Sequence, residues 1–208
     1  MPSRDLSPFA PLPGTVPYPR ALFIDIWGTL VHPPERGYAR SFEELEFAAG
    51  AIDALFRATQ AGWRIYLVGN AEAVARGLVS AEAWQAMEAR LLAHLAEHGV
   101  RVDRSYVCLD DPVNGVPGRR KDSVYHLPNT GAFYHAAHTD RVELRKSWVV
   151  GDSTLELVAG WRAGVRLAGV DSGVGLADRT FDIAPEIRGP HLARVVQDLL
   201  ALEGALHP

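Results

Sequence analysis

Residues 21–31 read Ala-Leu-Phe-Ile-Asp-Ile-Trp-Gly-Thr-Leu-Val, and this stretch decides the fold. Its first four residues form a short apolar run, which is typical of a β-strand covered on both faces. Asp25 ends the run, and Gly28 and Thr29 then allow the backbone to turn sharply. Ligand chemistry in open α/β sheets lies beyond the carboxyl ends of such strands. We therefore predict a functional role for Asp25, while an ordinary strand-to-turn junction remains the alternative for these residues alone.

The rest of the chain alternates strand-like apolar runs with helical stripes. Further strands are predicted at residues 64–68, 104–108, 147–150 and 165–170. Helices are predicted at about 52–59, 80–98, around 133, 154–162 and 192–202. This alternation predicts an α/β fold with a doubly wound parallel sheet and right-handed crossovers. Residues 32–47 and 109–129 are predicted to be irregular, and the second of these loops is long enough to suggest a function.

The length of 208 residues suits one domain, which we place at residues 20–208. Residues 1–19 contain six prolines, which predict an extended N-terminal arm on the surface. The net charge of −4 and the absence of a long basic tract argue against a nucleic-acid partner. No apolar run approaches the length of a membrane span, and Cys108 is the only cysteine. These features predict a cytoplasmic protein without a membrane partner.

Residues 21–31 resemble the first motif of the haloacid dehalogenase superfamily, an apolar run followed by Asp-x-Asp-Gly-Thr-Leu. The resemblance implies a Rossmann-like single domain with little or no cap, in which Asp25 is the nucleophile and Gly28 and Thr29 contact the substrate. Trp27 stands where related phosphatases carry the Asp that protonates the leaving oxygen and then activates water. Indole does neither. An aromatic residue at this position is found in the dehalogenases of the superfamily, whose halide leaving group needs no proton.

Residues 69–77 resemble the sequence Thr-Asn-Gln-Ser-Gly-Ile-Ala-Arg-Gly of the histidinol-phosphate and heptose-bisphosphate phosphatase branch. Asn70 and Arg76 match this second motif, and Gly69 replaces its phosphate-binding threonine. A backbone N–H at Gly69 can still donate a hydrogen bond. The resemblance therefore implies that Gly69, Asn70 and Arg76 bind a phosphorylated small molecule. The alternative for this stretch is an ordinary strand-to-helix loop.

A second carboxylate, Asp152, follows the predicted strand at residues 147–150, and Glu156 comes four residues later. Two strand-end carboxylates that converge in an apolar sheet repel each other unless a cation lies between them. Magnesium suits such oxygen donors. The resemblance implies that Asp25, the backbone carbonyl of Trp27 and Asp152 bind Mg²⁺, with Glu156 as a further acid of the metal site. The alternative is that Asp152 only caps the following helix.

The third motif of related phosphatases contains a lysine that balances the charges of nucleophile and phosphate, and Leu127 stands at that position. Arg120 and Lys121, in the loop just upstream, are the candidates to replace the lysine. The same branch often binds structural zinc through four Cys and His residues in this loop. Only Cys108 is present here, and one thiolate cannot hold a structural zinc ion. We therefore predict no zinc.

The replacements at Trp27, Gly69 and Leu127 bear directly on activity. Loss of a general acid or base typically costs about 10²–10⁴ in rate, and loss of an electrostatic donor about 10²–10³. The sequence thus favours a pseudo-enzyme, a binding or regulatory module that keeps the magnesium and phosphate pocket but has weak or lost catalysis. The alternative is an active hydrolase in which Asp25 attacks a phosphate monoester or a carbon that bears a halide. The sequence identifies no protein partner, substrate or oligomeric state.

Overall fold

The computed structural model describes residues 18–206, so nearly all of the predicted arm at residues 1–19 lies outside the described part. Within it, six parallel strands form one sheet in the order β5-β4-β1-β6-β7-β8. The strands are β1 (Ala21–Asp25), β4 (Arg64–Asn70), β5 (Val102–Cys108), β6 (Trp148–Gly151), β7 (Arg166–Val170) and β8 (Ile187–Gly189). The predicted α/β class and doubly wound parallel sheet are confirmed.

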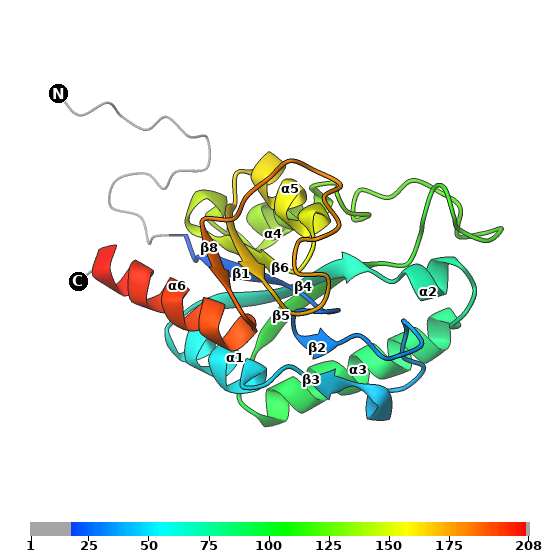
Figure 1. Cartoon of the computed structure of the whole chain (residues 1–208), viewed down its shortest axis with the longest axis horizontal. Coiled ribbons are helices and arrows are strands. Elements are labelled where there is room, and N and C mark those ends of the chain that lie inside the picture. Colours follow the sequence, from blue (N-terminus) through cyan, green and yellow to red (C-terminus); the bar gives the residue numbers. More distant parts are fainter. Residues whose placement is uncertain (1–17, 207–208) are drawn as a thin grey trace.

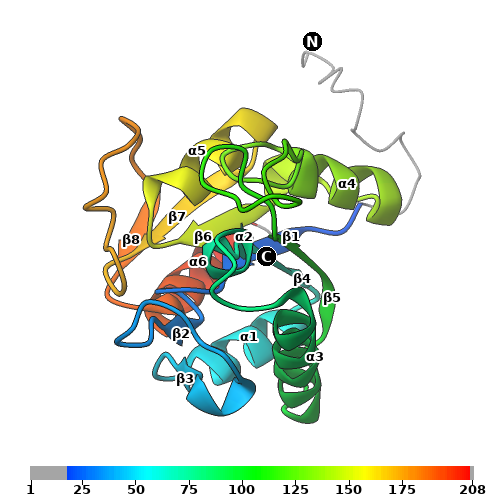
Figure 2. The same ribbon diagram turned by 90° about the vertical axis from the view of Figure 1, so that its right-hand side faces the viewer.

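Helices cover both faces of the sheet (Figures 1 and 2). One face packs against α1 (Ala51–Gln60), α3 (Ala81–Glu97) and α6 (Leu192–Leu206), and the other against α4 (Gly131–Asp140) and α5 (Thr154–Ala163). The short elements are β2 (Val31–His32), η1 (Phe42–Glu44), β3 (Glu46–Phe47), α2 (Glu72–Ala75) and η2 (Leu144–Lys146). The sequence analysis did not predict these short elements or the three-residue β8. Each is too short for a hydrophobic repeat to reveal it.

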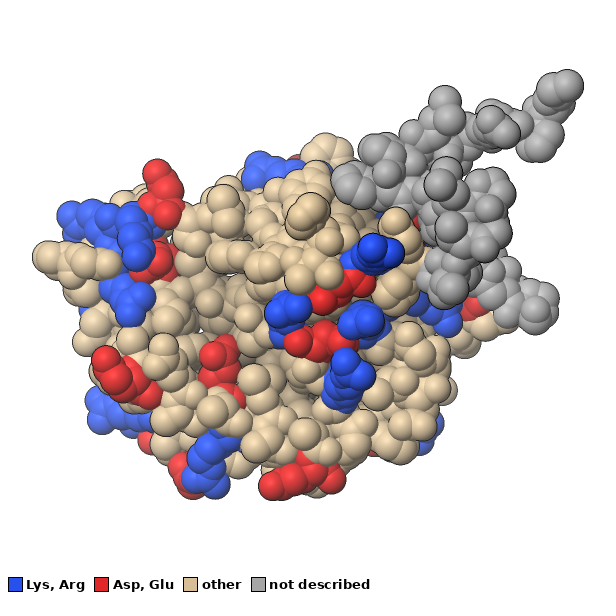
Figure 3. All heavy atoms as spheres, turned by 180° about the vertical axis from the view of Figure 1, so that it is seen from behind, with Lys and Arg blue, Asp and Glu red and all other residues tan. Residues whose placement is uncertain are grey.

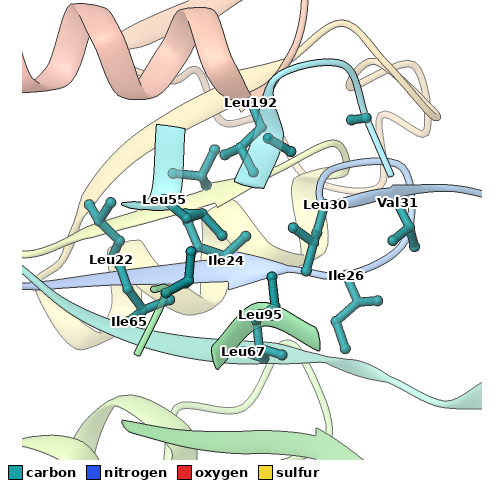
Figure 4. Packing of buried hydrophobic residues seen from close by; sticks show 14 of the residues in the cluster. Leu22, Ile24, Ile26, Leu30, Val31, Leu55, Ile65, Leu67, Leu95 and Leu192 are labelled. Atoms are coloured by element: carbon teal, nitrogen blue, oxygen red, sulfur yellow. The ribbon is translucent and has the colours of Figure 1, made fainter. Parts of the chain in front are cut away.

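The central strand β1 is buried on both faces, as predicted. Successive side chains of a strand point to opposite faces, so Leu22 and Ile24 lie in the layer formed with α1, α3 and α6 (Figure 4). On the other face, the ring of Phe23 lies 5.1 Å from that of Tyr66 and 4.6 Å from that of Phe133 in α4. Burying apolar side chains on both faces leaves Asp25 at the carboxyl edge of the sheet.

A buried carboxylate, Glu203, ties α6 to the strands. It accepts hydrogen bonds from Arg166 (2.7 Å), Arg20 (3.3 Å) and the indole N–H of Trp148 (3.3 Å). The guanidinium of Arg166 also lies 3.9 Å from the centre of the Trp148 ring. Because Glu203 is only 5% exposed, loss of its charge would leave Arg20 without this buried ion pair and Arg166 with only its second, more exposed partner, Glu186.

We expect Glu203→Gln to lower the free energy of unfolding by about 2–3 kcal/mol, since charged hydrogen bonds in a buried network are lost. Urea denaturation followed by circular dichroism measures this change. The matched control is Asp198→Asn, which removes the exposed pair with Arg194 in the same helix and should change stability by about 0.5 kcal/mol or less. Equal effects of the two substitutions would contradict a stabilising role for Glu203.

Within residues 18–206, no helix combines the length and the apolar character needed to cross a membrane. Basic and acidic side chains intermingle on the face shown in Figure 3, without one broad basic patch. The predicted absence of nucleic-acid and membrane partners and the cytoplasmic location stay predictions, as do the domain limits.

Candidate functional site

The carboxyl ends of neighbouring parallel strands bring two carboxylates together. Asp25 ends β1, and Asp152 directly follows β6, which pairs with β1. Both are buried, and both line a cavity of about 380 Å³. The cavity is also lined by Trp27, Asn70 and Glu156 of the predicted site and by residues that the sequence analysis did not single out, namely Pro33, Gly37, Tyr38, Glu72, Ala73, Ser153, Leu155, Val174, Asp178 and Thr180.

The buried acids of this cavity disfavour one another's charge. Burial raises the pKa of Asp25 well above its usual value, and the charges of Glu156 and Asp152 raise it further. Burial likewise raises the pKa values of Asp152 and Glu156. The Oδ2 atom of Asp25 is buried without a hydrogen-bond partner among the described residues. A carboxylate in such a place needs a proton or a cation to offset the cost of burial.

The oxygen atoms that Asp25 and Asp152 bring to the cavity are ligands of the kind that magnesium prefers. Among the described residues, the Oδ2 atom of Asp25 has no hydrogen-bond partner. Oδ2 of Asp152 accepts the N–H of Val174 at 2.6 Å, so Oδ1 is the atom of Asp152 that remains for a metal. Residues 18–206 contain no group of three or more His, Cys, Asp or Glu side chains arranged to hold a metal ion. A magnesium ion would therefore depend on these two carboxylates, the carbonyl of Trp27 and water, which is a coordination that magnesium accepts.

Two glycines pack tightly against the carboxylate of Asp152. A Cβ atom on Gly28 would lie 2.1 Å from Oδ2 of Asp152, and one on Gly173 would lie 2.0 Å from it. Gly173 belongs to the loop after β7, and Ser172 of this loop donates a hydrogen bond to the carbonyl of Gly28 at 2.7 Å. The loop therefore connects the turn after Asp25 to Asp152.

Of the three predicted phosphate-binding residues of the second motif, only Asn70 lines the cavity, whereas Gly69 and Arg76 do not. The side chain of Asn70 accepts the N–H of Leu127 at 2.9 Å and donates to its carbonyl at 3.2 Å. The side chain of Leu127 is buried in the apolar core rather than in the cavity. Gly69 has φ +146°, and a Cβ there would lie 3.1 Å from Oδ1 of Asp25. Arg76 pairs with Glu72 at 2.9 Å and does not line the cavity.

The two loop cations of the predicted site lie outside the cavity. Arg120 donates from Nε to the carbonyl of Gly115 at 2.9 Å, and the Nζ atom of Lys121 lies 3.5 Å from a carboxylate oxygen of Asp110. The thiol of Cys108 donates to the carbonyl of Asp110 at 3.4 Å. The absence of zinc stays a prediction.

Thr29 is buried beside the cavity rather than in its lining, and its hydroxyl has no hydrogen-bond partner among the described residues. Trp27 is half-buried and packs near Trp84, with 6.4 Å between ring centres. Asp178, which the sequence analysis missed, accepts the backbone N–H of Thr154 at 3.0 Å and so caps the first turn of α5.

Three larger cavities lie elsewhere among the described residues. One of about 760 Å³ lies between α1 and the first turns of α6, one of about 700 Å³ lies at the start of α4, and one of about 600 Å³ is lined by Pro34, Glu35, Arg36 and Glu44. None of them contains Asp25 or Asp152. We place the candidate active site at the smaller cavity because it holds the buried acids at the carboxyl edge of the sheet, where α/β folds perform their chemistry.

Comparison with known proteins points to one group. No family model matches the chain. A D-glycero-beta-D-manno-heptose-1,7-bisphosphate 7-phosphatase from Mesorhizobium japonicum is 29% identical over 169 residues, which cover 81% of this chain and 77% of that protein. One of the same name from Pseudomonas putida is 28% identical, covering 88% of this chain and 97% of that protein.

A solved structure of a protein of this kind has a similar fold. The D,D-heptose 1,7-bisphosphate phosphatase from B. bronchiseptica, complexed with magnesium and phosphate, superimposes with a TM-score of 0.74 and 27% identity. The superposition covers 88% of this chain and 99% of that structure. The chain thus has the haloacid dehalogenase fold and resembles, in sequence and in structure, the heptose-bisphosphate phosphatase branch of that superfamily.

Proposed function

We propose that this chain is a magnesium-dependent phosphatase for a phosphorylated small molecule, with Asp25 as the nucleophile. The observation that carries the proposal is the buried Oδ2 of Asp25, which has no hydrogen-bond partner within residues 18–206 and lies in the same cavity as Asp152 at the carboxyl edge of the sheet. The relatives are named as phosphatases, which favours an active enzyme over the pseudo-enzyme hypothesis from the sequence. The same names favour a phosphate ester over a halide as the substrate.

The reaction follows from the residues of the cavity. A carboxylate oxygen of Asp25 attacks phosphorus, the bond from phosphorus to the leaving oxygen breaks, and that oxygen departs with the electron pair. Water then hydrolyses the acyl phosphate on Asp25. Magnesium, when bound by Asp25, Asp152 and the carbonyl of Trp27, supplies positive charge next to the phosphate. Because Trp27 has no proton to give to the leaving oxygen, phosphate esters with acidic leaving groups are the favoured substrates.

Turnover of p-nitrophenyl phosphate tests the proposal, because p-nitrophenolate leaves without a proton from the enzyme. We expect hydrolysis that requires magnesium and stops on chelation by EDTA. Release of p-nitrophenolate is followed by absorbance at fixed protein concentration. A protein that neither hydrolyses this ester nor binds magnesium in calorimetry would contradict the proposed function.

Magnesium should also stabilise the fold. A ligand that binds only the folded state at a concentration of 100 Kd contributes about 2.7 kcal/mol. For a protein of this size we therefore expect Tm to rise by about 5–10 °C. Differential scanning calorimetry with and without magnesium measures the shift. Asp152→Asn should remove most of it, whereas Asp198→Asn, on the far surface of α6, should keep it. An equal shift in both variants would contradict the assigned metal ligand.

The loop after β7 should hold Asp152 in the position that magnesium requires. We expect Gly173→Ala to weaken magnesium binding by about 10–100-fold, as outer-shell changes at metal sites do, because the added methyl group would displace the Asp152 carboxylate. Isothermal titration calorimetry measures the affinity. Gly118→Ala is the control, since Gly118 also has a positive φ of +93° but a Cβ there meets nothing within 4 Å. Equal magnesium affinities in the two variants would contradict this role.

A further inference from the structure

An arginine on the edge strand of the sheet holds both ends of the turn that follows β7. Arg188 belongs to β8, which lies at the edge of the sheet beside β7 (Figure 2). Its Nε atom donates to Oδ1 of Asp171 at 2.6 Å, and its Nη2 atom donates to the carbonyl of Gly175 at 3.0 Å. A guanidinium carries its donors in a rigid planar fork. These two contacts therefore fix Asp171 and Gly175 relative to each other.

The turn between these two anchors contacts the candidate active site. The hydroxyl of Ser172 donates to the carbonyl of Gly28 at 2.7 Å, and the N–H of Val174 donates to Oδ2 of Asp152 at 2.6 Å. The N–H of Leu176 donates to the backbone carbonyl of Asp152, also at 2.6 Å. All three contacts come from the turn that the arginine holds or from the residue directly after it.

Arg188 itself lies away from the buried acids. It does not line the cavity that holds Asp25 and Asp152, and its side chain faces the larger cavity between α1 and α6 instead. The side chain is 53% exposed, so its ion pair with Asp171 contributes little to the stability of the fold. Any effect of Arg188 on Asp152 must therefore pass through the turn.

We propose that Arg188 is a positioning residue for the magnesium site. It holds the turn in the place from which the N–H of Val174 binds Oδ2 of Asp152, so that Oδ1 is left for the metal. This inference rests on the proposed function, because Asp152 is taken to be a magnesium ligand. It assigns a role in metal binding to a residue that touches neither the metal ligands nor the cavity that contains them.

Magnesium titration calorimetry of the full chain tests the inference with Arg188→Gln. We expect this variant to bind magnesium about tenfold more weakly than the wild type, at the lower end of the range for outer-shell changes at metal sites. The sign of the effect is diagnostic. Removal of a positive charge by itself would favour the binding of a cation, so weaker binding reports a displaced ligand rather than a changed field.

Two further variants separate position from charge. Arg194→Gln removes the same charge from an ion pair of the same kind, since Arg194 is 56% exposed and its Nε lies 2.9 Å from Asp198. Its magnesium affinity should not fall. Arg188→Lys keeps the charge, but an ammonium group does not reproduce the fork that holds both acceptors. Its affinity should lie between those of the wild type and Arg188→Gln.

A measurement without magnesium tests the same role independently of the metal. In the magnesium-free full chain, the amide of Val174 should exchange with solvent about fivefold faster in Arg188→Gln than in the wild type, the factor expected when one ordinary hydrogen bond is lost. Amide exchange followed by NMR measures this rate, and Arg194→Gln should leave it unchanged.

The outcomes distinguish this inference from the proposed function. If the wild type binds magnesium, equal or tighter binding by Arg188→Gln, or an equal loss in Arg194→Gln, overturns the inference. If the wild type binds no magnesium, the proposed function fails, and amide exchange alone decides whether Arg188 holds the turn against Asp152. Faster exchange of the Val174 amide in Arg188→Gln then supports that role, and unchanged exchange overturns it.

Discussion

Asp25→Asn is expected to reduce the turnover of p-nitrophenyl phosphate by about 10⁴-fold or more, the scale seen when a catalytic nucleophile is removed. An amide nitrogen does not attack phosphorus, and the neutral side chain also binds magnesium poorly. The kcat of the purified variant measures the loss. Wild-type protein mixed in at about one part in 10⁴ shows that the assay can detect a loss of this size.

The same substitution should stabilise the magnesium-free fold. Asp25 is only 4% exposed and lies beside the charges of Asp152 and Glu156, so the uncharged amide removes repulsion that the folded state must bear. We therefore expect a higher Tm without magnesium together with the loss of activity. A variant that loses activity only because it unfolds would show a lower Tm, and a variant that keeps wild-type turnover would contradict the assignment of the nucleophile.

The strand-end acids were predictable from the sequence because burial leaves a clear pattern. An apolar run that stops at a carboxylate indicates a buried strand with a polar end, and both Asp25 and Asp152 fit this description. The parallel order of β1 and β6 then brings the two ends to one edge. The resemblance to the superfamily led to the same two residues.

The sequence did not reveal that the loop after β7 contacts Asp152. Its contact with Asp152 is made by the backbone N–H of Val174, a group that every residue except proline possesses. Gly173 and Gly175 mark a turn, but Leu176 and Arg179 also have positive φ, so composition marks the turns of this loop only in part. The contribution of this loop depends on backbone position, which the sequence pattern does not encode.

Two replacements that the sequence analysis treated as lost groups have structural reasons. Leu127 fills the apolar core, so a lysine at this position would require the side chain to leave the core or the ammonium group to be buried. The φ of Gly69 favours glycine, and a threonine there would also crowd Asp25. Trp27, in contrast, lines the cavity and can be exchanged more simply.

Trp27→Asp is accordingly expected to raise kcat/KM for an alkyl phosphate such as glycerol 3-phosphate by about 10²–10⁴, the usual contribution of a general acid and base. An alkoxide leaves only when it is protonated, whereas p-nitrophenolate does not need a proton. The gain should therefore be much smaller for p-nitrophenyl phosphate. Steady-state assays with both esters measure the two ratios.

The control for this prediction is Trp27→Asn, which has the shape of the Asp variant but no proton to transfer. Both substitutions remove the indole from its contact with Trp84, so both lose the same packing and open the same space. A gain confined to the Asp variant and to the alkyl ester assigns the effect to proton transfer. Equal gains in both variants would instead mean that the indole only restricts access to the cavity, and the missing acid would no longer explain the choice of leaving group.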